Sequence, residues 1–273
     1  SPASVLRITP VSDLMAIWFL ELMRTEPAMK DASDAVELTD VKGQVDVDHV
    51  SFAYEGDLDV LHDVDLHIKA GETLAVVGPS GGGKSTLCKL IPRFYDASQG
   101  SVCIDGVDVK DYTLDELRHK VGVVPQKAVL FAGTIADNIR WGKQDATEAE
   151  IDEALEIAQA KEFVDGKENG IYFKITQGGK NLSGGQKQRL TIARAVVRKP
   201  EILILDDSAS ALDFATDAAL RKAIREKTKG MTVFLVSQRA STIMNSDKII
   251  VMDDGQIAGI GYSGFQVVVH QYI

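Results

Sequence analysis

A glycine-rich segment near the end of the first third of the chain has the residue types and spacing to bind a phosphate group. It reads Gly78-Pro79-Ser80-Gly81-Gly82-Gly83-Lys84-Ser85 and matches the pattern G-x-x-x-x-G-K-[ST], whose backbone N–H groups cradle phosphates. Lys84 would reach the β- and γ-phosphates of a nucleotide, and the Ser85 hydroxyl would take a Mg²⁺ position. An ordinary strand–helix turn is the plain alternative. The apolar run 74–77 before the segment and the helical pattern 85–91 after it favour nucleotide binding.

A second candidate for phosphate chemistry is the carboxylate of Asp206. It ends the apolar run Ile202-Leu203-Ile204-Leu205, which reads as a buried strand. Beside a phosphate loop, an Asp at the end of such a strand holds Mg²⁺. Many strands end in Asp, so this signal gains its weight from the glycine-rich segment earlier in the chain.

The pentapeptide Leu182-Ser183-Gly184-Gly185-Gln186 permits two interpretations. Ser183 and Gln186 have the spacing of a capping box, which would simply start a helix. The two glycines leave the N–H groups of that helix start open, so the same segment could also bind an anion.

The elements that must position these residues follow from hydrophobic periodicity. Strands are predicted at 45–54, 58–68, 74–77, 121–124, 202–205 and 233–236, with a slip near Asp48–His49 that indicates a bulge. Hairpins are predicted around Asp105-Gly106 and Asp254-Gly255, and helices at 85–91, after the Thr147/Glu150 capping box, after Gly185 and around 217–225. Strands alternating with helices predict an α/β fold, with a mainly parallel sheet and an antiparallel part near its start.

Composition restricts the class of protein. The formal net charge of −10 makes a general nucleic-acid binder improbable and predicts no nucleic-acid partner, because phosphate neutralisation needs clustered Lys and Arg. Cys88 and Cys103 are too few for a disulfide framework and are expected to be reduced thiols. No stretch approaches the roughly 18 apolar residues of a membrane span, and no signal peptide is recognisable. The polypeptide is therefore expected to be soluble and intracellular.

Taken together, the motifs resemble those of the ATP-binding cassette (ABC) family, over roughly residues 44–261. The pentapeptide 182–186 is that family's signature, Gln126 in Val123-Val124-Pro125-Gln126 matches its Q-loop, Tyr54 stands at its adenine-stacking position, and Ser210-Ala211-Leu212-Asp213 matches its D-loop. The resemblance implies a P-loop NTPase fold with a RecA-like core, an antiparallel β-subdomain and an α-helical subdomain at about 127–198, in a nucleotide-binding domain spanning 44–273.

The resemblance also assigns roles to individual residues. The Mg²⁺ ligands would be Ser85, Gln126 and Asp206, and the catalytic groups would be Lys84, Asp207 and Gln238. ATP would bind to Tyr54, Gly78, Pro79, Ser80, Gly81, Gly82, Gly83, Lys84, Ser85, Thr86 and Gln126. Leu182, Ser183, Gly184, Gly185, Gln186 and Asp213 would contact the ATP of a partner cassette.

Some of these residues have plainer interpretations. Tyr54 shares a strand face with Val50 and Phe52 and could be a core residue, Gln126 could cap a loop, and Asp213 could cap a helix. The basic run Lys187, Arg189, Arg194, Arg198 and Lys199 is expected to be a solvated helix face.

Two positions depart from the family pattern. Asp207 stands where hydrolytic members have the Glu that polarises the attacking water, and Gln238 stands where they have a His that contacts the γ-phosphate. Asp withdraws its carboxylate by one C–C bond, and a 1 Å misplacement can cost ~10²-fold in rate. Gln can donate a hydrogen bond but carries no positive charge. Together these changes predict a site that binds ATP and hydrolyses it slowly.

Within the family the chain resembles exporter cassettes, through 131–139 and the segment 176–180, in which Gln177 replaces the usual Glu. Residues 1–43, with an amphipathic helix at 11–24 and a polar linker at 30–43, are expected to be the end of a transmembrane-domain helix and its linker. The expected assembly is the degenerate subunit of a heterodimeric multidrug-type exporter, paired with a different, consensus cassette. It would sit at the cytoplasmic face of the plasma membrane. A competent cassette of a homodimeric exporter and a non-transport ATP switch are the alternatives.

Overall fold

The computed structural model describes residues 29–36, 40–54, 58–208, 210–237 and 245–262. The predicted helix at 11–24 and the catalytic candidate Gln238 lie outside them. The chain divides into two compact units, Ser1–Lys30 and Asp31–Ile273, and the described helices and strands all lie in the second. The boundary predicted between residues 43 and 44 stays a prediction.

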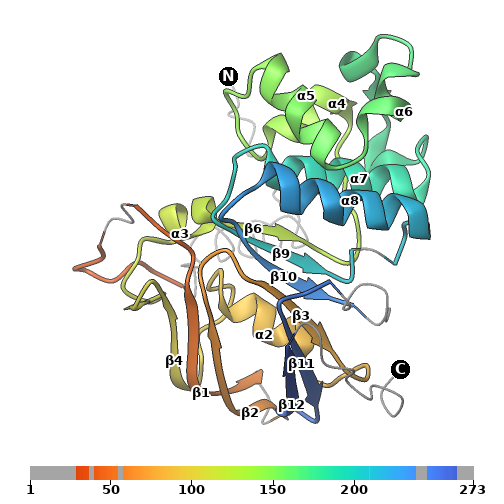
Figure 1. The fold of residues 1–273 in the computed structure, drawn as a ribbon. Helices are drawn as coiled ribbons and strands as arrows, with labels where there is room; N and C mark the ends of the chain where they lie inside the picture. The colour runs from red at the N-terminus through yellow and green to blue at the C-terminus, as the bar shows by residue number, and fades with distance from the viewer. Residues whose placement is uncertain (1–28, 37–39, 55–57, 209, 238–244, 263–273) are drawn as a thin grey trace, which may run out of the picture. The chain divides into compact units, whose positions relative to one another are not determined.

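The centre of this unit is a six-stranded sheet, as far as the described residues show (Figure 1). Its order is β12 (Gln256–Tyr262), β11 (Lys248–Asp253), β3 (Thr73–Val77), β10 (Thr232–Val236), β9 (Ile202–Asp206) and β6 (Val121–Val124). Every neighbouring pair is parallel except β11 with β12. The predicted mainly parallel sheet is thus confirmed.

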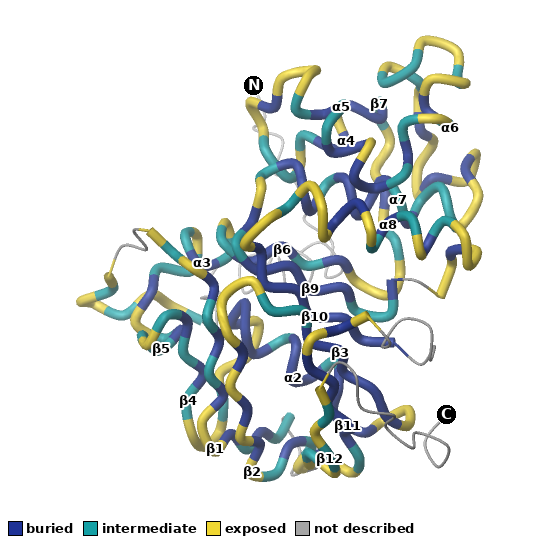
Figure 2. The backbone as a smooth tube through the Cα atoms, in the orientation of Figure 1, coloured by how far each residue is buried: buried dark blue, intermediate teal, exposed yellow. Residues whose placement is uncertain are grey.

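Both faces of the sheet are buried, which explains the near-continuous apolar runs of its strands. In β9 and β10 the side chains alternate between two hydrophobic cores, and the central strands appear as the most buried part of the chain in Figure 2. Ile202, Ile204, Phe234 and Val236 enter one core; Leu203, Leu205, Val233 and Leu235 enter the other.

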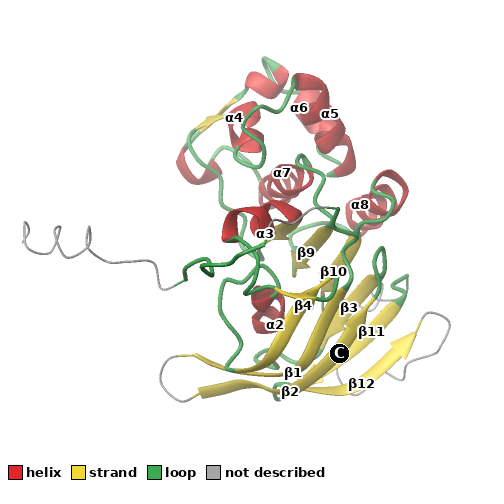
Figure 3. Ribbon diagram, turned by 90° about the vertical axis from the view of Figure 1, so that its left-hand side faces the viewer, coloured by secondary structure: helices red, strands yellow, loops and turns green. Residues whose placement is uncertain are grey.

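The first core contains α2 (Lys84–Leu90), which packs between the central sheet and a second, antiparallel sheet (Figure 3). The order of the second sheet is β2 (Leu58–Ile68), β1 (Val45–Tyr54), β4 (Gln99–Ile104) and β5 (Val107–Asp108). Its strand register shifts between Val47 and Val50, and His49 has a φ of 49°. The bulge predicted near Asp48–His49 is confirmed. The short helix α3 (Leu114–Lys120) adds Leu117 to this core.

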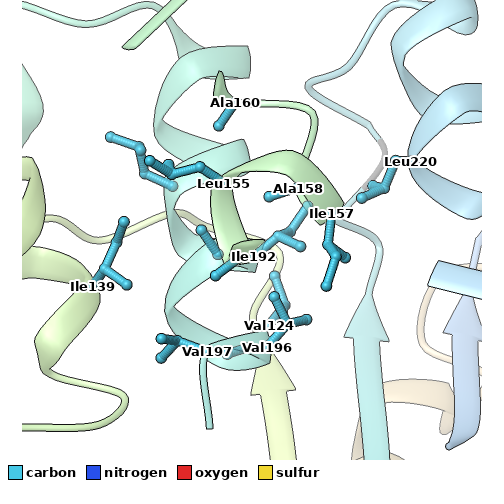
Figure 4. Close-up of a cluster of buried hydrophobic side chains, with 14 of the residues drawn as sticks. Val124, Ile139, Leu155, Ile157, Ala158, Ala160, Ile192, Val196, Val197 and Leu220 are labelled. Carbon is cyan, nitrogen blue, oxygen red and sulfur yellow. The ribbon is translucent and has the colours of Figure 1, made fainter. Parts of the chain in front are cut away.

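The second core lies under a group of helices on the opposite face. Figure 4 shows Leu155 and Ile192 from two of these helices, with Val124 at the end of β6 and Leu220 from a third helix. The elements are α4 (Ile135–Arg140), α5 (Glu148–Ile157), α6 (Lys161–Asp165), α7 (Gly184–Val196), α8 (Phe214–Lys227), the 3₁₀ turns η1 (Gly170–Tyr172) and η2 (Gln177–Gly179), and the strand pair β7 (Gly133–Thr134) and β8 (Lys174–Ile175).

Side-chain caps fix where several of these helices begin. Thr147 and Glu150 form the predicted capping box at α5, and Thr134 and Asp137 form another at α4. Each box satisfies N–H groups that a helix start leaves without an intrahelical partner.

The predicted solvated face of the basic run is wrong for its three arginines. Arg189 donates to Gln159 O at 2.7 Å, Arg194 to Asn138 O at 2.8 Å, and Arg198 to Val121 O at 2.9 Å. Burial lowers the pKa of all three guanidinium groups. These guanidinium groups donate to backbone carbonyls at the ends of helices, strands and loops. The spacing of charged residues in the sequence does not reveal such contacts.

Two further expectations can be compared with the structure. Cys88 and Cys103 are both free thiols, as predicted. Within the described residues, no helix combines the length and apolar character needed to cross a bilayer.

Candidate functional site

The candidate site lies where the carboxyl ends of the parallel strands meet. Val76 of β3 pairs with Val236 of β10, which pairs with Asp206 of β9. The loops that follow these strands therefore leave the sheet at one edge, where open parallel sheets bind their ligands. This edge brings together the glycine-rich loop after β3, Gln126 after β6 and the two aspartates at the end of β9.

Glycine is required at two points of the loop by close approach of other atoms. Gly78 has a φ of 137°, and a Cβ there would lie 1.9 Å from Met252 O. Gly83 has a φ of 91°, and a Cβ there would lie 2.7 Å from a methyl carbon of Leu61. A side chain at position 78 would thus clash with the backbone of β11, whereas at position 83 the positive φ favours glycine and the tip of the Leu61 side chain would have to move.

Lys84 is the first residue of α2 and is 8% exposed. Its Nζ donates to the carbonyl oxygens of Gly78 and Pro79, at 2.9 and 2.6 Å. Burial lowers the pKa of Lys84, while the charges of Asp206 and Asp207 act in the opposite direction. The ammonium group is thus held inside the curve of the loop, close to the two carboxylates.

Ser85 and Asp206 are joined directly. Ser85 Oγ donates to Asp206 Oδ1 at 2.8 Å, so a hydroxyl and a carboxylate oxygen face one another across the loop and β9. Among the described residues, no cluster of three or more His, Cys, Asp or Glu could hold a metal alone. A hydroxyl and a carboxylate nevertheless fit Mg²⁺, which takes few protein ligands where substrate phosphates supply the others.

Asp207 lies one residue beyond β9 in an unusual backbone conformation. Its φ is 46°, in the left-handed region that Asp tolerates better than most residues. Its N–H donates to Val236 O at 3.0 Å, and its Oδ2 accepts a hydrogen bond from Gln126 Nε2 at 3.0 Å. Gln126, predicted as a metal ligand, thus contacts the predicted catalytic carboxylate.

Tyr54 packs against the first core and also contacts the helix that follows the phosphate loop. Its ring packs against the first core and lies edge-on to Phe52 and to Tyr95, with centroid distances of 4.8 and 5.1 Å. Its hydroxyl lies 3.2 Å from Thr86 Oγ1, on the helix that follows the phosphate loop. The interpretation of Tyr54 as a core residue is therefore confirmed, since it is partly buried against the first core. Its stacking on adenine stays a prediction. The contact of Tyr95 with Tyr54 was not predicted; Tyr95 follows Phe94 just after α2.

The signature pentapeptide forms the start of α7. Ser183 Oγ accepts from Gln186 N, and Gln186 Oε1 accepts from Ser183 N, so the predicted capping box is present. Leu182 is buried, whereas Ser183 and Gly184 are exposed. In the described part of the chain, no hydrogen bond joins this segment to the phosphate loop.

The D-loop lies against the signature. A Cβ at Gly185 would approach Ala211 O to 3.1 Å. Asp213 caps α8, accepting from Thr216 N at 2.9 Å and from Thr216 Oγ1 at 2.8 Å. These hydrogen bonds lower the pKa of Asp213. The helix-cap interpretation of Asp213 is confirmed, and its contact with a partner's ATP stays a prediction.

The fold and this edge define the class of protein. A glycine-rich loop between a buried parallel strand and a helix, facing a strand that ends in a carboxylate, is the arrangement of a P-loop nucleotide-binding protein.

Comparison with known proteins identifies the family. The sequence model described as "ABC transporter" matches residues 61–210, and the chain belongs to that family. It is 46% identical over 239 residues to "Uncharacterized ABC transporter ATP-binding protein YwjA" of Bacillus subtilis, covering 88% of this chain and 42% of that protein. It is 47% identical over 232 residues to "Putative multidrug export ATP-binding/permease protein YgaD" of the same organism, covering 85% and 40%.

A solved structure has the same fold. "Structure of a bacterial Atm1-family ABC exporter with ATP bound" superimposes with a TM-score of 0.87 at 37% identity, covering 92% of this chain and 44% of that one. The predicted ABC ATPase fold is thus confirmed, and the chain is an ABC transporter nucleotide-binding domain. It spans about two-fifths of the length of the relatives that it matches.

Proposed function

We propose that this chain is the ATP-binding cassette of a multidrug-type ABC exporter, and that its own nucleotide site is the slow site of a heterodimer. The relative YgaD of Bacillus subtilis is named as a putative multidrug export protein, and the matching solved structure is that of an ABC exporter. Both similarities support the exporter assignment. ATP binding would drive closure of two cassettes, closure would move the membrane domains, and hydrolysis would reset them.

The phosphate chain of ATP would bind to the backbone N–H groups of residues 78–83 and to Lys84. The positive end of the α2 dipole adds to this attraction. Lys84 would exchange its bonds with Gly78 O and Pro79 O for phosphate oxygens, because the carbonyls hold the ammonium within the loop. Tyr54, whose hydroxyl is near Thr86, would stack on the adenine.

The residues that would hold Mg²⁺ are Ser85, Asp206 and Gln126. Bound with ATP, the ion would neutralise charge that develops on the β- and γ-phosphates. Ser85 and Asp206 already lie within hydrogen-bond distance of each other.

The main support for the slow-site proposal is the position of the Asp207 carboxylate. It is one methylene shorter than Glu, and its Oδ2 is bonded to Gln126. A carboxylate that is shorter and hydrogen-bonded to Gln126 is poorly placed to polarise a water molecule in line with the γ-phosphate. The residue type of Gln238, which has no charge to offer the γ-phosphate, supports the same proposal.

The signature of this chain would complete the site of a partner. Ser183 and Gly184 are exposed at the start of α7, where open N–H groups attract an anion. Leu182, Gly185, Gln186 and Asp213 would complete this contact. We infer that the partner is a different, consensus cassette, and that a transmembrane domain holds the pair at the cytoplasmic face of the plasma membrane.

The double reversal Asp207→Glu with Gln238→His tests this proposal. Paired with a consensus cassette, the reverted chain should hydrolyse ATP at its own site about 10²-fold faster than the original. Steady-state ATPase measurements would use a partner that keeps its signature but has lost the carboxylate of its own catalytic site, so that only the site of this chain turns over. An unchanged rate would favour the competent homodimer, and ATPase that no membrane-domain partner alters would favour the non-transport switch.

A further inference from the structure

A cavity of about 610 Å³ opens at the opposite edge of the central sheet from the phosphate loop. Ala70, Glu201 and Met231 line it, and each precedes a strand: β3, β9 and β10 respectively. Because these strands are parallel, the cavity lies at their amino ends. Its volume is in the range of sites that bind small molecules.

The floor of the cavity is apolar and buried. It includes Ile157 at the end of α5, Val196 at the end of α7 and Met231 before β10, which are 4, 3 and 8% exposed. These side chains come from three separate elements and belong to the second core. The cavity therefore has a preformed apolar floor, of which each of these side chains leaves only a small part exposed.

The rim of the cavity carries four lysines, and two of them have carboxylate partners. Lys199 pairs with Glu153 at 2.8 Å, and Lys227 pairs with Glu156 at 2.6 Å. Lys199 follows α7 and Lys227 is the last residue of α8, and a cation at the end of a helix offsets the negative end of its dipole. These two lysines are thus accounted for by the fold.

The other two, Lys42 and Lys229, are exposed and form no ion pair within the described residues. Lys42 lies in the segment that precedes β1 and not at the end of a described helix, so a helix dipole does not explain its position at the rim. Its N–H donates to Asp105 Oδ2 at 2.6 Å, and Gln44 N donates to Asp105 Oδ1 at 2.9 Å. The segment that carries Lys42 is therefore fixed to the β4–β5 hairpin, and its position at the rim is preformed.

We propose that this cavity binds a small amphipathic anion: a compact apolar body that carries one carboxylate, sulfonate or phosphate group. The body would rest on Ile157, Val196 and Met231, and the anionic group would pair with Lys42 and Lys229. Such a ligand would connect the segment preceding β1 to the ends of α5 and α8. The proposal does not depend on the hydrolysis rate at the phosphate loop.

The test compares three amphiphiles that share an eight-carbon chain. Octyl phosphate, octyl glucoside and octyltrimethylammonium are titrated below their micelle-forming concentrations into the intact chain. Binding is followed by methyl NMR of Met231 and Ile157. Octyl phosphate should shift both methyl signals in a saturable way, and the other two should bind about tenfold or more weakly, because only the phosphate pairs with the lysines.

A pair of charge-reversed variants assigns the site. Lys42→Glu with Lys229→Glu should weaken octyl phosphate binding about tenfold, and these exposed positions should leave folding intact. Lys174→Glu with Lys180→Glu changes the net charge equally at exposed residues elsewhere and should leave binding unchanged. The proposal is overturned if Met231 and Ile157 show no shift, if octyl glucoside binds as tightly, or if both double variants act alike.

Discussion

Gln126 Nε2 lies 3.0 Å from Asp207 Oδ2 and donates a hydrogen bond to it. The amide that follows β6 therefore holds the carboxylate that follows β9, across the edge of the sheet. A Glu at position 207 would carry its carboxylate one methylene further from the backbone. The contact thus connects the residue expected to bind Mg²⁺ with the residue expected to act on water.

The charge of Asp207 can be removed with little change in volume. Asp207→Asn should reduce single-turnover hydrolysis at this chain's own site about 10²-fold or to background, because an amide does not accept a proton from water. ATP affinity, measured by calorimetry, should stay within a few-fold, since Asp207 is not expected to bind the nucleotide. Unchanged hydrolysis would show that another group activates the water.

Lys84→Ala tests the phosphate loop. The change removes the ammonium that the loop holds at Gly78 O and Pro79 O, and ATP affinity should fall at least about tenfold because a charge-assisted contact with phosphate is lost. The matched control is Lys89→Ala, in the last turn of the same helix, which should bind ATP like the original chain. Equal affinity of Lys84→Ala and the control would contradict the assigned role.

The two loop glycines Gly78 and Gly81 differ in what surrounds them. Both have positive φ, but a Cβ at Gly78 would clash with Met252 O at 1.9 Å, whereas a Cβ at Gly81 has nothing within 4 Å. Gly81→Ala should cost about 1–2 kcal/mol in free energy of unfolding, from the backbone conformation alone. Gly78→Ala should cost more than about 4 kcal/mol, because β11 must move as well. Chemical denaturation of the two variants measures the difference.

The capping box of α5 predicts a dependence of stability on pH. Hydrogen bonds from Lys143 and Thr147 lower the pKa of Glu150 to about 2, below its ordinary value of 4.5. Its contribution to stability is therefore present above about pH 4.5 and is lost as the pH falls toward 2. Glu150→Gln should melt at a lower temperature than the original chain at pH 6, and this difference should stay constant down to about pH 4.5 and then shrink as the pH falls to 2. A difference that is constant over this range would contradict the assignment.

Local patterns in the sequence predicted much of the fold. The predicted bounds of β2 and β6 agree with the structure, because period-2 and continuous apolar runs reflect burial on one or both sheet faces. The capping boxes were predictable since they need only residues three apart. The hairpin at Asp105-Gly106 is present. Its first strand, β4, begins at Gln99, three residues before the apolar run 102–104 that indicated the hairpin.

Contacts between distant segments could not be predicted in this way. Nothing near Arg194 or Arg198 in the sequence indicates that they donate to Asn138 O and Val121 O. The bond between Gln126 and Asp207, and the positive φ of Asp207, depend likewise on how β6 and β9 pair. The motifs predicted which residues belong to the candidate site, while the sheet order determines which of them touch.

We propose that this chain binds ATP and hydrolyses it slowly unless a different cassette supplies the competent site. The most direct test measures Mg²⁺-ATP affinity and steady-state turnover of the chain alone and mixed with a consensus cassette. Tight binding, negligible turnover alone and robust turnover in the mixture are the predicted result. Brisk turnover by the chain alone, as a homodimer, would contradict the claim and show that Asp207 suffices as the catalytic carboxylate.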